Sequence, residues 1–471
     1  MKTYRHLLTV AALMAVMSAS AQGVRIYLKG FGSPIDYPAS QIEKIEFYPA
    51  EEDNNNNNEN QNQNQGNEDP TEDKKFLEET GIQFLNQVKA SDFRNITKSV
   101  SKLDEYDADA LEDWSEDCLN AVKTALGGSY TEEGKYGYIY QYTDYKYLLK
   151  ASTFTGHFIV RNNKWVKESD ASDLQFTFTD SNGKVCVARV TTSGSTKTIH
   201  VVDDDDSQGW NGNIRNYDRN KYYIDVPSHI EATYTMGGKE MVSVSVDIDV
   251  SALGEEWDLS SQGASTSVYA RVSKESGGQY DIVVNRAGYY AGSGAYVDFS
   301  LSNDGQVILT AEATAAGTLN VNSKNVYDEP EIAPEDFGAA SANVDILGRV
   351  QVKSTINNVG NFVKYLQDAD DKDDDKSEHR RMVGRANSEL NAEFFYNGGS
   401  DSRGTLAMES FERDSWGSKK RYEARPIITF TSDGSSYAFD TYFSEDAFHT
   451  VVATYKNLVD DFNDLLKSRK K

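Results

Sequence analysis

The feature that most constrains the fold is a run in which apolar and polar side chains alternate. Residues 241–250 read Met-Val-Ser-Val-Ser-Val-Asp-Ile-Asp-Val, so from Val242 onward Val or Ile alternates with Ser or Asp. Because successive side chains of a strand point to opposite faces, one face of this strand is apolar and the other meets water. Parallel sheets are covered on both faces, so the run predicts an antiparallel sheet with one solvated side.

Further segments of the chain have the same strand character and are separated by turn signals. Alternating or β-branched residues recur at 174–179, 185–191, 230–236, 392–396, 405–411 and 427–431. Turn dipeptides and tripeptides stand between the strands: Asn182-Gly183, Gly237-Gly238, Gly277-Gly278, Asn303-Asp304-Gly305 and Asp433-Gly434. Such turns join neighbouring antiparallel strands, so we expect a series of hairpins.

Helical periodicity marks both ends of the main body and one interval inside it. Apolar residues spaced three or four apart predict helices over 77–88, 93–103, 111–126 and 350–366. Ser444 can cap a last helix over 444–467, which carries eight large apolar side chains on one stripe. We expect this stripe to pack on the apolar face of the sheet, although docking on a partner protein is the alternative.

These elements together predict an α+β fold, a large antiparallel and curved sheet with helices on one face. The main body spans residues 74–471, which is enough for one large domain or two smaller ones. Pro330 and Pro334 mark the segment 328–336 as the best place for a boundary if there are two.

The first 21 residues have the pattern of a signal peptide. Lys2 and Arg5 precede the apolar run 7–17, and Ala19-Ser20-Ala21 is a small-x-small cleavage site, so the mature chain should begin at Gln22. The run is shorter than the roughly 20 residues that span a bilayer, and no later segment is long and apolar enough. We therefore expect an exported protein, periplasmic, outer-membrane-associated or extracellular, without direct membrane insertion.

Residues 22–49 predict a short β module. Val24, Ile26 and Leu28 alternate with polar residues and indicate a first strand, and a second is expected at 35–37. The run 35–48, Ile-Asp-Tyr-Pro-Ala-Ser-Gln-Ile-Glu-Lys-Ile-Glu-Phe-Tyr, resembles a module of many exported Bacteroidota-type proteins that ends Pro-x-Ser-x-Ile-x-x-Ile-x-Phe. The resemblance implies an envelope or extracellular setting and no activity. In that family a lipoprotein signal often precedes the module, whereas no Cys follows the apolar run here. Residues 229–251 and 279–319 also look like parts of uncharacterised exported proteins of this group.

Residues 50–73 predict a disordered linker. Asn and Gln alternate with acidic residues, and no apolar side chain is available to offset the entropy of ordering.

The net charge limits the partners. The chain carries −26, and loss of Lys2 and Arg5 with the signal peptide leaves −28. Such a charge repels phosphate backbones and anionic lipid surfaces, which argues against nucleic acid. Cationic partners, divalent ions and neutral glycans remain compatible with it.

Two cysteines, Cys118 and Cys186, lie in a predicted helix and a predicted strand. An oxidising compartment permits a disulfide between them, and two buried free thiols are the alternative that we favour.

No segment carries a catalytic, metal or cofactor motif. Asp203 to Asp206 and the run 368–375 suggest calcium, but a loop from Asp204 has Arg215 where the bidentate Glu belongs. We interpret both runs as solvated loops. The histidines of the mature chain lack the His-Glu-x-x-His spacing: His157, His200, His229, His379 and His449. We expect no catalytic residue, metal or cofactor.

Tyrosines form the most unusual pattern. Tyr136, Tyr138, Tyr140 and Tyr142 occupy alternate positions, so a strand would carry four rings on one face. Exposed rings of this kind stack on sugars, whereas buried rings would pack against the helices, which is the interpretation we favour.

The functional expectation is a secreted, non-enzymatic protein with a binding or envelope-associated role. The alternatives are a hydrophobic-ligand (lipid) carrier and a glycan-acting hydrolase. A carrier would show an apolar pocket, and a hydrolase would show two carboxylates beside an aromatic cleft. An envelope protein, a glycan or a lipid are the candidate partners, and the oligomeric state is open.

Overall fold

The computed structural model of the chain describes residues 24–26, 35–37, 72–120, 123–134, 137–256, 258–319, 333–413, 420–443 and 448–467. The predicted signal peptide and cleavage site lie outside these residues, as does the linker up to residue 71. The chain divides into two units, Met1–Lys75 and Phe76–Lys471. In the first unit, β1 (Val24–Ile26) and β2 (Ile35–Tyr37) pair antiparallel, which confirms the two short strands.

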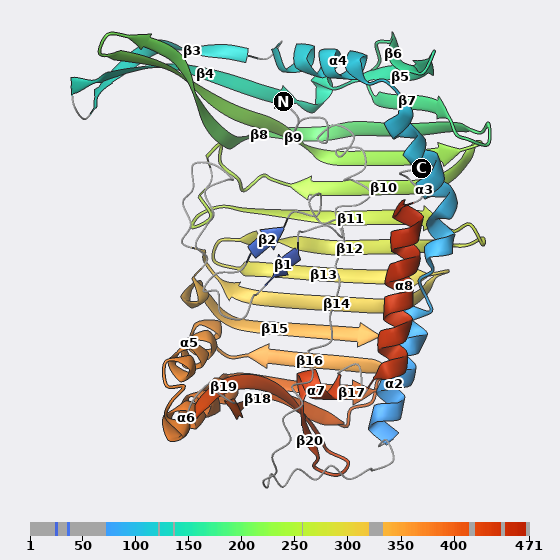
Figure 1. The fold of residues 1–471 in the computed structure, drawn as a ribbon, viewed down its shortest axis with the longest axis vertical. Helices are drawn as coiled ribbons and strands as arrows, with labels where there is room; N and C mark the ends of the chain where they lie inside the picture. Colours follow the sequence, from blue (N-terminus) through green and yellow to red (C-terminus); the bar gives the residue numbers. More distant parts are fainter. Residues whose placement is uncertain are drawn as a thin grey trace, which may run out of the picture. The chain divides into compact units, whose positions relative to one another are not determined.

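A large sheet dominates the second unit, and most of its strands pair in chain order (Figure 1). From β8 onward each strand is antiparallel to the next. These strands are β8 (Val185–Asn211), β9 (Ile214–Met236), β10 (Lys239–Asp249), β11 (Gly263–Ser273), β12 (Gln279–Tyr290), β13 (Gly294–Asn303), β14 (Gln306–Gly317), β15 (Phe337–Ile346), β16 (Val350–Ile356), β17 (Leu390–Tyr396), β18 (Gly404–Arg413), β19 (Arg421–Phe430) and β20 (Ser436–Ala438).

The remaining strands flank the long β8 and β9. β3 (Lys123–Glu133) pairs with β4 (Ile139–Lys150), which lies parallel to the first half of β9. On the other side, β6 (Lys164–Ser169), β5 (Gly156–Arg161) and β7 (Leu174–Thr179) lead to β8, with β5 and β7 parallel. The α+β prediction with a large antiparallel sheet is confirmed, although the sheet is not strongly curled.

Turn chemistry explains the hairpins. Gly237 and Gly238 have φ of 60° and 79° between β9 and β10, and Asp304 and Gly305 have φ of 51° and 79° between β13 and β14. Positive φ at both central residues gives a turn whose twist matches the flanking strands, and glycine adopts it without steric cost.

Helices cross the ends of the strands on one face of the sheet (Figure 1). They are α2 (Glu72–Leu85), the 3-10 turn η2 (Ala90–Phe93), α3 (Arg94–Ser101), η3 (Lys102–Glu105) and α8 (His449–Lys467). α4 (Asp109–Asn120) packs on β6, while α5 (Val359–Asp370) and α6 (Lys376–Glu389) pack on β15 and β17 to β19. No helix in the described part of the chain is long and apolar enough to cross a membrane.

Hydrogen bonds fix the helical layer to the strand ends. Asp92 of η2 is buried and accepts from Tyr280 Oη at 2.8 Å and from Ser276 Oγ at 2.7 Å. The ring of Phe93 stacks on Tyr280, with centroids 5.5 Å apart, and also touches Phe462 of α8. Burial and the hydrogen bond to Asp92 raise the pKa of Tyr280, which therefore stays protonated and keeps donating.

A buried apolar cluster lies where α8 and α7 (Phe439–Tyr442) meet the last strands. The buried cluster contains Phe394, Ile428, Phe430, Tyr442 and Phe448, with Leu77, Val451 and Val452 against it. Val451 of α8 also closes on Gly81 of α2. The first turns of α8 thus pack on the sheet as expected, whereas Tyr455 and Val459 farther along the helix stay exposed.

The central strands, β11 to β16, carry few buried side chains. Most of their residues are half-buried or exposed on both faces. Tyr269 and Val297 are each 38% exposed although their side chains point to opposite faces. Across the expected boundary near 328–336, β14 pairs with β15, so the sheet is continuous there.

Several predicted elements were wrong in type or extent. The third helix ends at Asn120, and Leu126 belongs to β3, where Gly127 and Gly128 disfavour a helix. Val350 and Ile356 form β16 instead of starting a helix, and α6 was missed because its apolar stripe is weak. The predicted linker loses its last two residues to α2, which begins at Glu72.

The two acidic runs are also not both loops. Asp203 to Asp206 lie within β8, where Asp203 is in register with Lys221 and Asp205 with Arg219 of β9. In the second run, Asp368 belongs to α5, and Asp375 caps α6 by accepting from two backbone N–H groups.

Candidate functional site

The predicted tyrosine row lies at the start of β4, although Tyr136 is outside the described residues. Tyr140 and Tyr142 are half-buried, and both rings lie against Tyr217 of β9, with centroids 5.9 and 5.6 Å apart. The parallel register of β4 and β9 places these residues side by side. These rings therefore form a cross-strand cluster on the sheet.

Beside this cluster, an arginine lies between two rings. The guanidinium carbon of Arg215 is 4.1 Å from the ring centroid of Tyr138 and 3.4 Å from that of Trp210. Trp210 is 70% exposed. Arg215 has no hydrogen bond or ion pair with the residues that the structure describes, in contrast to Arg219, which faces Asp144 at 4.0 Å.

The cysteines are free thiols, so the disulfide is not formed. Cys118 Sγ donates to the carbonyl oxygen of Thr153 at 3.3 Å, and Cys186 lies near the carbonyl oxygen of Lys184 at 3.7 Å. Each thiol is buried in its own neighbourhood, and burial raises the pKa of both.

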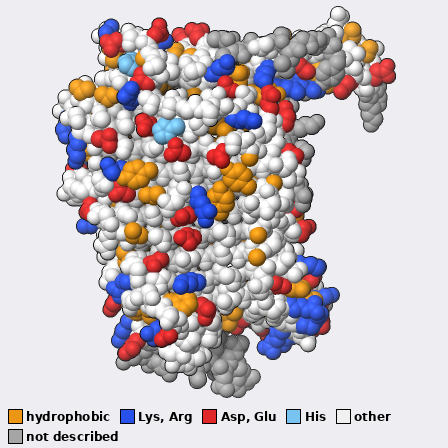
Figure 2. All heavy atoms as spheres, turned by 180° about the vertical axis from the view of Figure 1, so that it is seen from behind, with side chains coloured by type: hydrophobic (Ala, Val, Ile, Leu, Met, Phe, Trp, Pro, Cys, Tyr) orange, Lys and Arg blue, Asp and Glu red, His pale blue; other side chains and the backbone are white. Residues whose placement is uncertain are grey.

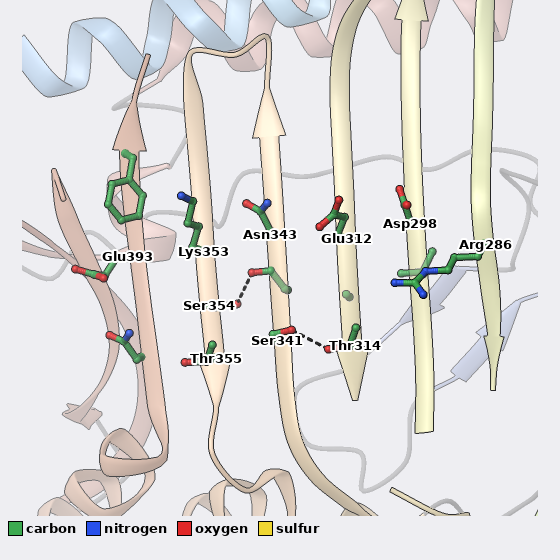
Figure 3. A pocket seen from close by; sticks show the side chains of 15 residues that line it. Arg286, Asp298, Glu312, Thr314, Ser341, Asn343, Lys353, Ser354, Thr355 and Glu393 are labelled. Atoms are coloured by element: carbon green, nitrogen blue, oxygen red, sulfur yellow. Dashed lines mark hydrogen bonds between the residues drawn. The ribbon is translucent and has the colours of Figure 1, made fainter. Parts of the chain in front are cut away.

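The pairing register carries one face of the sheet across all the central strands. Two residues that lie opposite each other in a strand pair share a face. Following these pairs from strand to strand connects Glu231 of β9 with Tyr269 of β11 and Ser300 of β13. Tyr217 and Asp298 are an even number of residues from Glu231 and Ser300, so both lie on this face. We call it the open face, because it lies away from α2 and α8 (Figures 1 and 3).

The open face is mostly polar between its aromatic residues. Figure 2 shows the sheet from the side opposite to Figure 1, with charged and hydrophobic side chains scattered singly over the middle among other residues.

A shallow groove of about 370 Å³ lies on this face across β12 to β17 (Figure 3). One row of side chains runs straight across six strands, since each member is in register with the next. The row is Arg286, Asp298, Glu312, Asn343, Lys353 and Glu393. Hydroxyl and amide groups form a second row beside it: Thr314, Ser341, Thr355 and Asn391.

Charges in the groove are close to one another but not paired. Glu312 and Glu393 have no ion pair or hydrogen bond with a described residue, and Asp298 accepts only from Asn285 Nδ2, at 3.1 Å. The two cations lie over rings instead, Arg286 at 5.0 Å from the centroid of Tyr296 and Lys353 at 4.9 Å from that of Phe395. The carboxylate oxygens are thus available as acceptors.

Asn343 lies at the centre of the first row. Its side-chain oxygen is shielded from solvent, yet no described residue donates a hydrogen bond to it. A buried acceptor without a donor costs about 1–3 kcal/mol, and a ligand whose binding shifts the neighbouring side chains and lets it donate to this oxygen would remove that cost.

Two stacked tyrosines border the groove on the side of β12 and β13. The rings of Tyr290 and Tyr296 lie 6.5 Å apart at an interplanar angle of 15°. Tyr290 Oη donates to Asp249 Oδ2 at 2.6 Å, and this bond raises the pKa of the phenol. The hydrogen bond therefore holds the ring in place beside the row.

Two of the described histidines help to hold the fold together. His157 and Arg189 both contact the buried Asp173, which ties β5 to β8. His200 is buried against Glu256 at 2.9 Å. Within the described ranges, no three His, Cys, Asp or Glu residues gather as metal ligands.

Sequence reasoning missed the groove. Its residues are ordinary polar positions in six strands, and only the register shows that they form one row. The signal was the repeated alternation itself, because polar positions on neighbouring strands share a face once hairpins align them.

Comparison with protein-family models, curated proteins and solved structures finds no match for this chain.

Proposed function

We propose that this chain is an exported, non-enzymatic protein that binds a glycan in the groove of its open face. The observation that carries the proposal is the shielded oxygen of Asn343, which lacks a donor at the centre of the row. Carboxylates of Asp298, Glu312 and Glu393 add further acceptors around it.

Acceptors in such excess favour a ligand rich in donors. A neutral saccharide offers many hydroxyl groups and also an apolar ring face, which can stack on Tyr296 or Tyr290 at the border. The carboxylates would repel an anionic ligand, so a neutral chain fits this groove better than an acidic one.

The groove supports a lipid carrier less well. A hydrophobic ligand would need an apolar cavity that buries most of its surface. Here, charged and hydrogen-bonding side chains line an open depression, and their desolvation would cost free energy without any compensating bond.

Export and an envelope setting rest on the sequence. The signal-peptide pattern of residues 1–21 and the module at 22–49 both favour a location where extracellular and envelope glycans occur. The main body would then present its open face to such a polymer.

The test is calorimetric titration of the mature chain with a panel of neutral oligosaccharides of several backbones. We expect at least one to bind, and Asn343→Ala to weaken it about tenfold, as expected for one lost hydrogen bond. Ser267→Ala, on the open face of β11 outside the groove, is the matched control and should bind normally. Equal affinity of the two variants, or no binding at all, would contradict the proposal.

One observation favours a second candidate, a glycan hydrolase. Asp298 and Glu312 are directly opposite on neighbouring strands, which places their Cβ atoms roughly 5 Å apart. Their carboxyl groups can therefore approach the separation of about 5–5.5 Å that retaining glycosidases use. Release of new reducing ends from the bound oligosaccharide, lost in Asp298→Asn while binding persists, would establish this reaction. Intact ligand after prolonged incubation favours the binding protein.

A further inference from the structure

The cluster around Arg215 is a separate polar and aromatic surface that the groove does not use. It combines Arg215 with Trp210 and Tyr138, and it continues into the stacked Tyr140, Tyr142 and Tyr217. From its geometry we infer a second binding site that takes a saccharide bearing a carboxylate, such as a uronic acid.

The position of the guanidinium supports this chemistry. Rings at 4.1 and 3.4 Å cover the guanidinium of Arg215, so approach over its flat face is hindered and its in-plane N–H donors remain for a partner. A carboxylate fits such a planar fork with two parallel hydrogen bonds. No acidic side chain among the described residues fills this role.

The neighbouring arginine shows the contrast on the same strand. Arg219 faces Asp144 of β4, and its guanidinium lies 5.0 Å from the ring of Tyr142. Arg219 thus already has a carboxylate nearby. Arg215 lies four residues earlier in β9, on the same face and closer to the β8–β9 hairpin, and it has only rings beside it.

The tyrosines supply the second requirement of a saccharide site. The rings of Tyr140 and Tyr142 lie 6.5 Å apart at 24° to each other, and Tyr217 completes the cluster at 29° to Tyr142. Half-buried rings in such an array offer a surface on which the apolar face of a sugar ring can stack. Trp210, 70% exposed, would add a further ring beside Arg215.

The net charge of −26 opposes acidic ligands in general. At physiological ionic strength this repulsion is screened beyond about 8 Å, so contacts at the site itself decide the binding. The expected ligand therefore carries its carboxylate close to a ring face that stacks at the same time.

The experiment uses the mature full-length chain and two matched probes, oligogalacturonate and its methyl ester, titrated at constant ionic strength. The ester has the same backbone and stacking faces but no charge. We expect the acid to bind at least tenfold more tightly than the ester, because a charge-assisted bidentate bond contributes more than a neutral one.

Two substitutions assign the preference to this site. Arg215→Gln should bring the affinity for the acid down to that for the ester, and Arg215→Lys should restore only part of it, because a point charge lacks the planar fork. Trp210→Ala should weaken both probes. Melting curves that coincide with that of the unaltered chain show that the variants are folded.

The outcomes separate this inference from the groove proposal. Binding of neutral oligosaccharides should be unchanged in Arg215→Gln, and binding of oligogalacturonate should be unchanged in Asn343→Ala. Equal binding of acid and ester, no binding of the acid by the unaltered chain, or a charge preference that survives Arg215→Gln would overturn the inference. Failure of the neutral panel alone would overturn only the groove proposal.

Discussion

The end of the sheet beneath α2, α7 and α8 and its central strands are built in different ways. At the covered end, Phe394, Phe430 and Phe448 belong to one buried cluster, and Phe430 is only 1% exposed. In β11 to β16, most side chains remain in contact with water on both faces, as Tyr269 and Val297 show.

The comparison teaches where stability and binding reside. Burial of apolar side chains is the main favourable term in folding, so the covered end should contribute most of it. The central strands depend more on backbone ladders and on cross-strand pairs, each worth roughly 0.2–1 kcal/mol. They can therefore carry polar side chains at little cost, which leaves the open face free to bind a ligand.

The largest effect should come from removing α8. Truncation after Phe443 deletes Phe448, Val451 and Val452 from the cluster, and each large apolar side chain contributes roughly 1.5–3 kcal/mol. Since domains are stable by only about 5–15 kcal/mol, we expect insoluble or unfolded protein in expression and circular-dichroism assays.

A shorter truncation is the matched control for this prediction. Ending the chain after Leu458 keeps the packed first turns and removes Phe462, which contacts Phe93. This variant should stay soluble and melt at a lower temperature. A folded chain with an unchanged melting transition after truncation at Phe443 would show that α8 is not part of the core.

Single substitutions should separate the two regions by several kcal/mol. Phe430→Ala leaves a cavity at the covered end and should lower the free energy of unfolding by about 3–5 kcal/mol. Val297→Ala, at a position 38% exposed in the centre, should lower it by less than about 1 kcal/mol. Urea denaturation measures both, and similar losses would remove the basis of the comparison.

Where α6 packs on the last strands, His379 should make the fold sensitive to acid. It is fully buried between α6 and β18, where Nδ1 lies 2.7 Å from Ser410 Oγ and Nε2 has no partner among the described residues. Burial lowers its pKa, so below about pH 6.5 the unfolded chain takes up a proton that the folded chain does not. The unfolding free energy should fall between pH 7.5 and 5.5, and fall less in His379→Asn. Parallel profiles would argue against this role.

On the open face, His229 should act with the opposite sign and a smaller effect. Its hydrogen bond to Asp247 at 2.7 Å, together with Glu231, raises its pKa. The stabilisation is complete below the unfolded pKa, about 6.5, and disappears as pH rises through the folded value. His229→Gln should therefore be less stable than the unaltered chain at pH 6 and equal to it at pH 9. A difference that grows toward pH 9 would contradict the sign.

Much of the fold could be predicted because local patterns agree with it. The alternation at 241–250 became β10 with Val242 and Val244 buried, and the turn residues Gly237-Gly238 stand between two paired strands as expected. The errors arose where local signals are ambiguous. Val350 fits a helical stripe and a strand equally well, and Asp203 to Asp206 look like a loop until the pairing with β9 is known.

The candidate site was less predictable because it depends on register. Tyr138, Tyr140 and Tyr142 were found as a row within one strand, but their partners Arg215 and Tyr217 are more than 70 residues away in the chain. Asn343 gives no local signal at all. Its importance follows only from its place between Glu312 and Lys353, which the pairing of three strands determines.

The most direct test measures stability and glycan binding on the same sample of Asn343→Ala. If the open face serves binding, the affinity of the variant for the neutral oligosaccharide falls about tenfold, while the unfolding free energy stays the same or rises by up to about 3 kcal/mol, because the substitution removes a buried acceptor whose missing donor costs about 1–3 kcal/mol. An unfolding free energy lowered by more than about 2 kcal/mol with unchanged affinity would instead make this residue part of the core and contradict the division between covered end and open face.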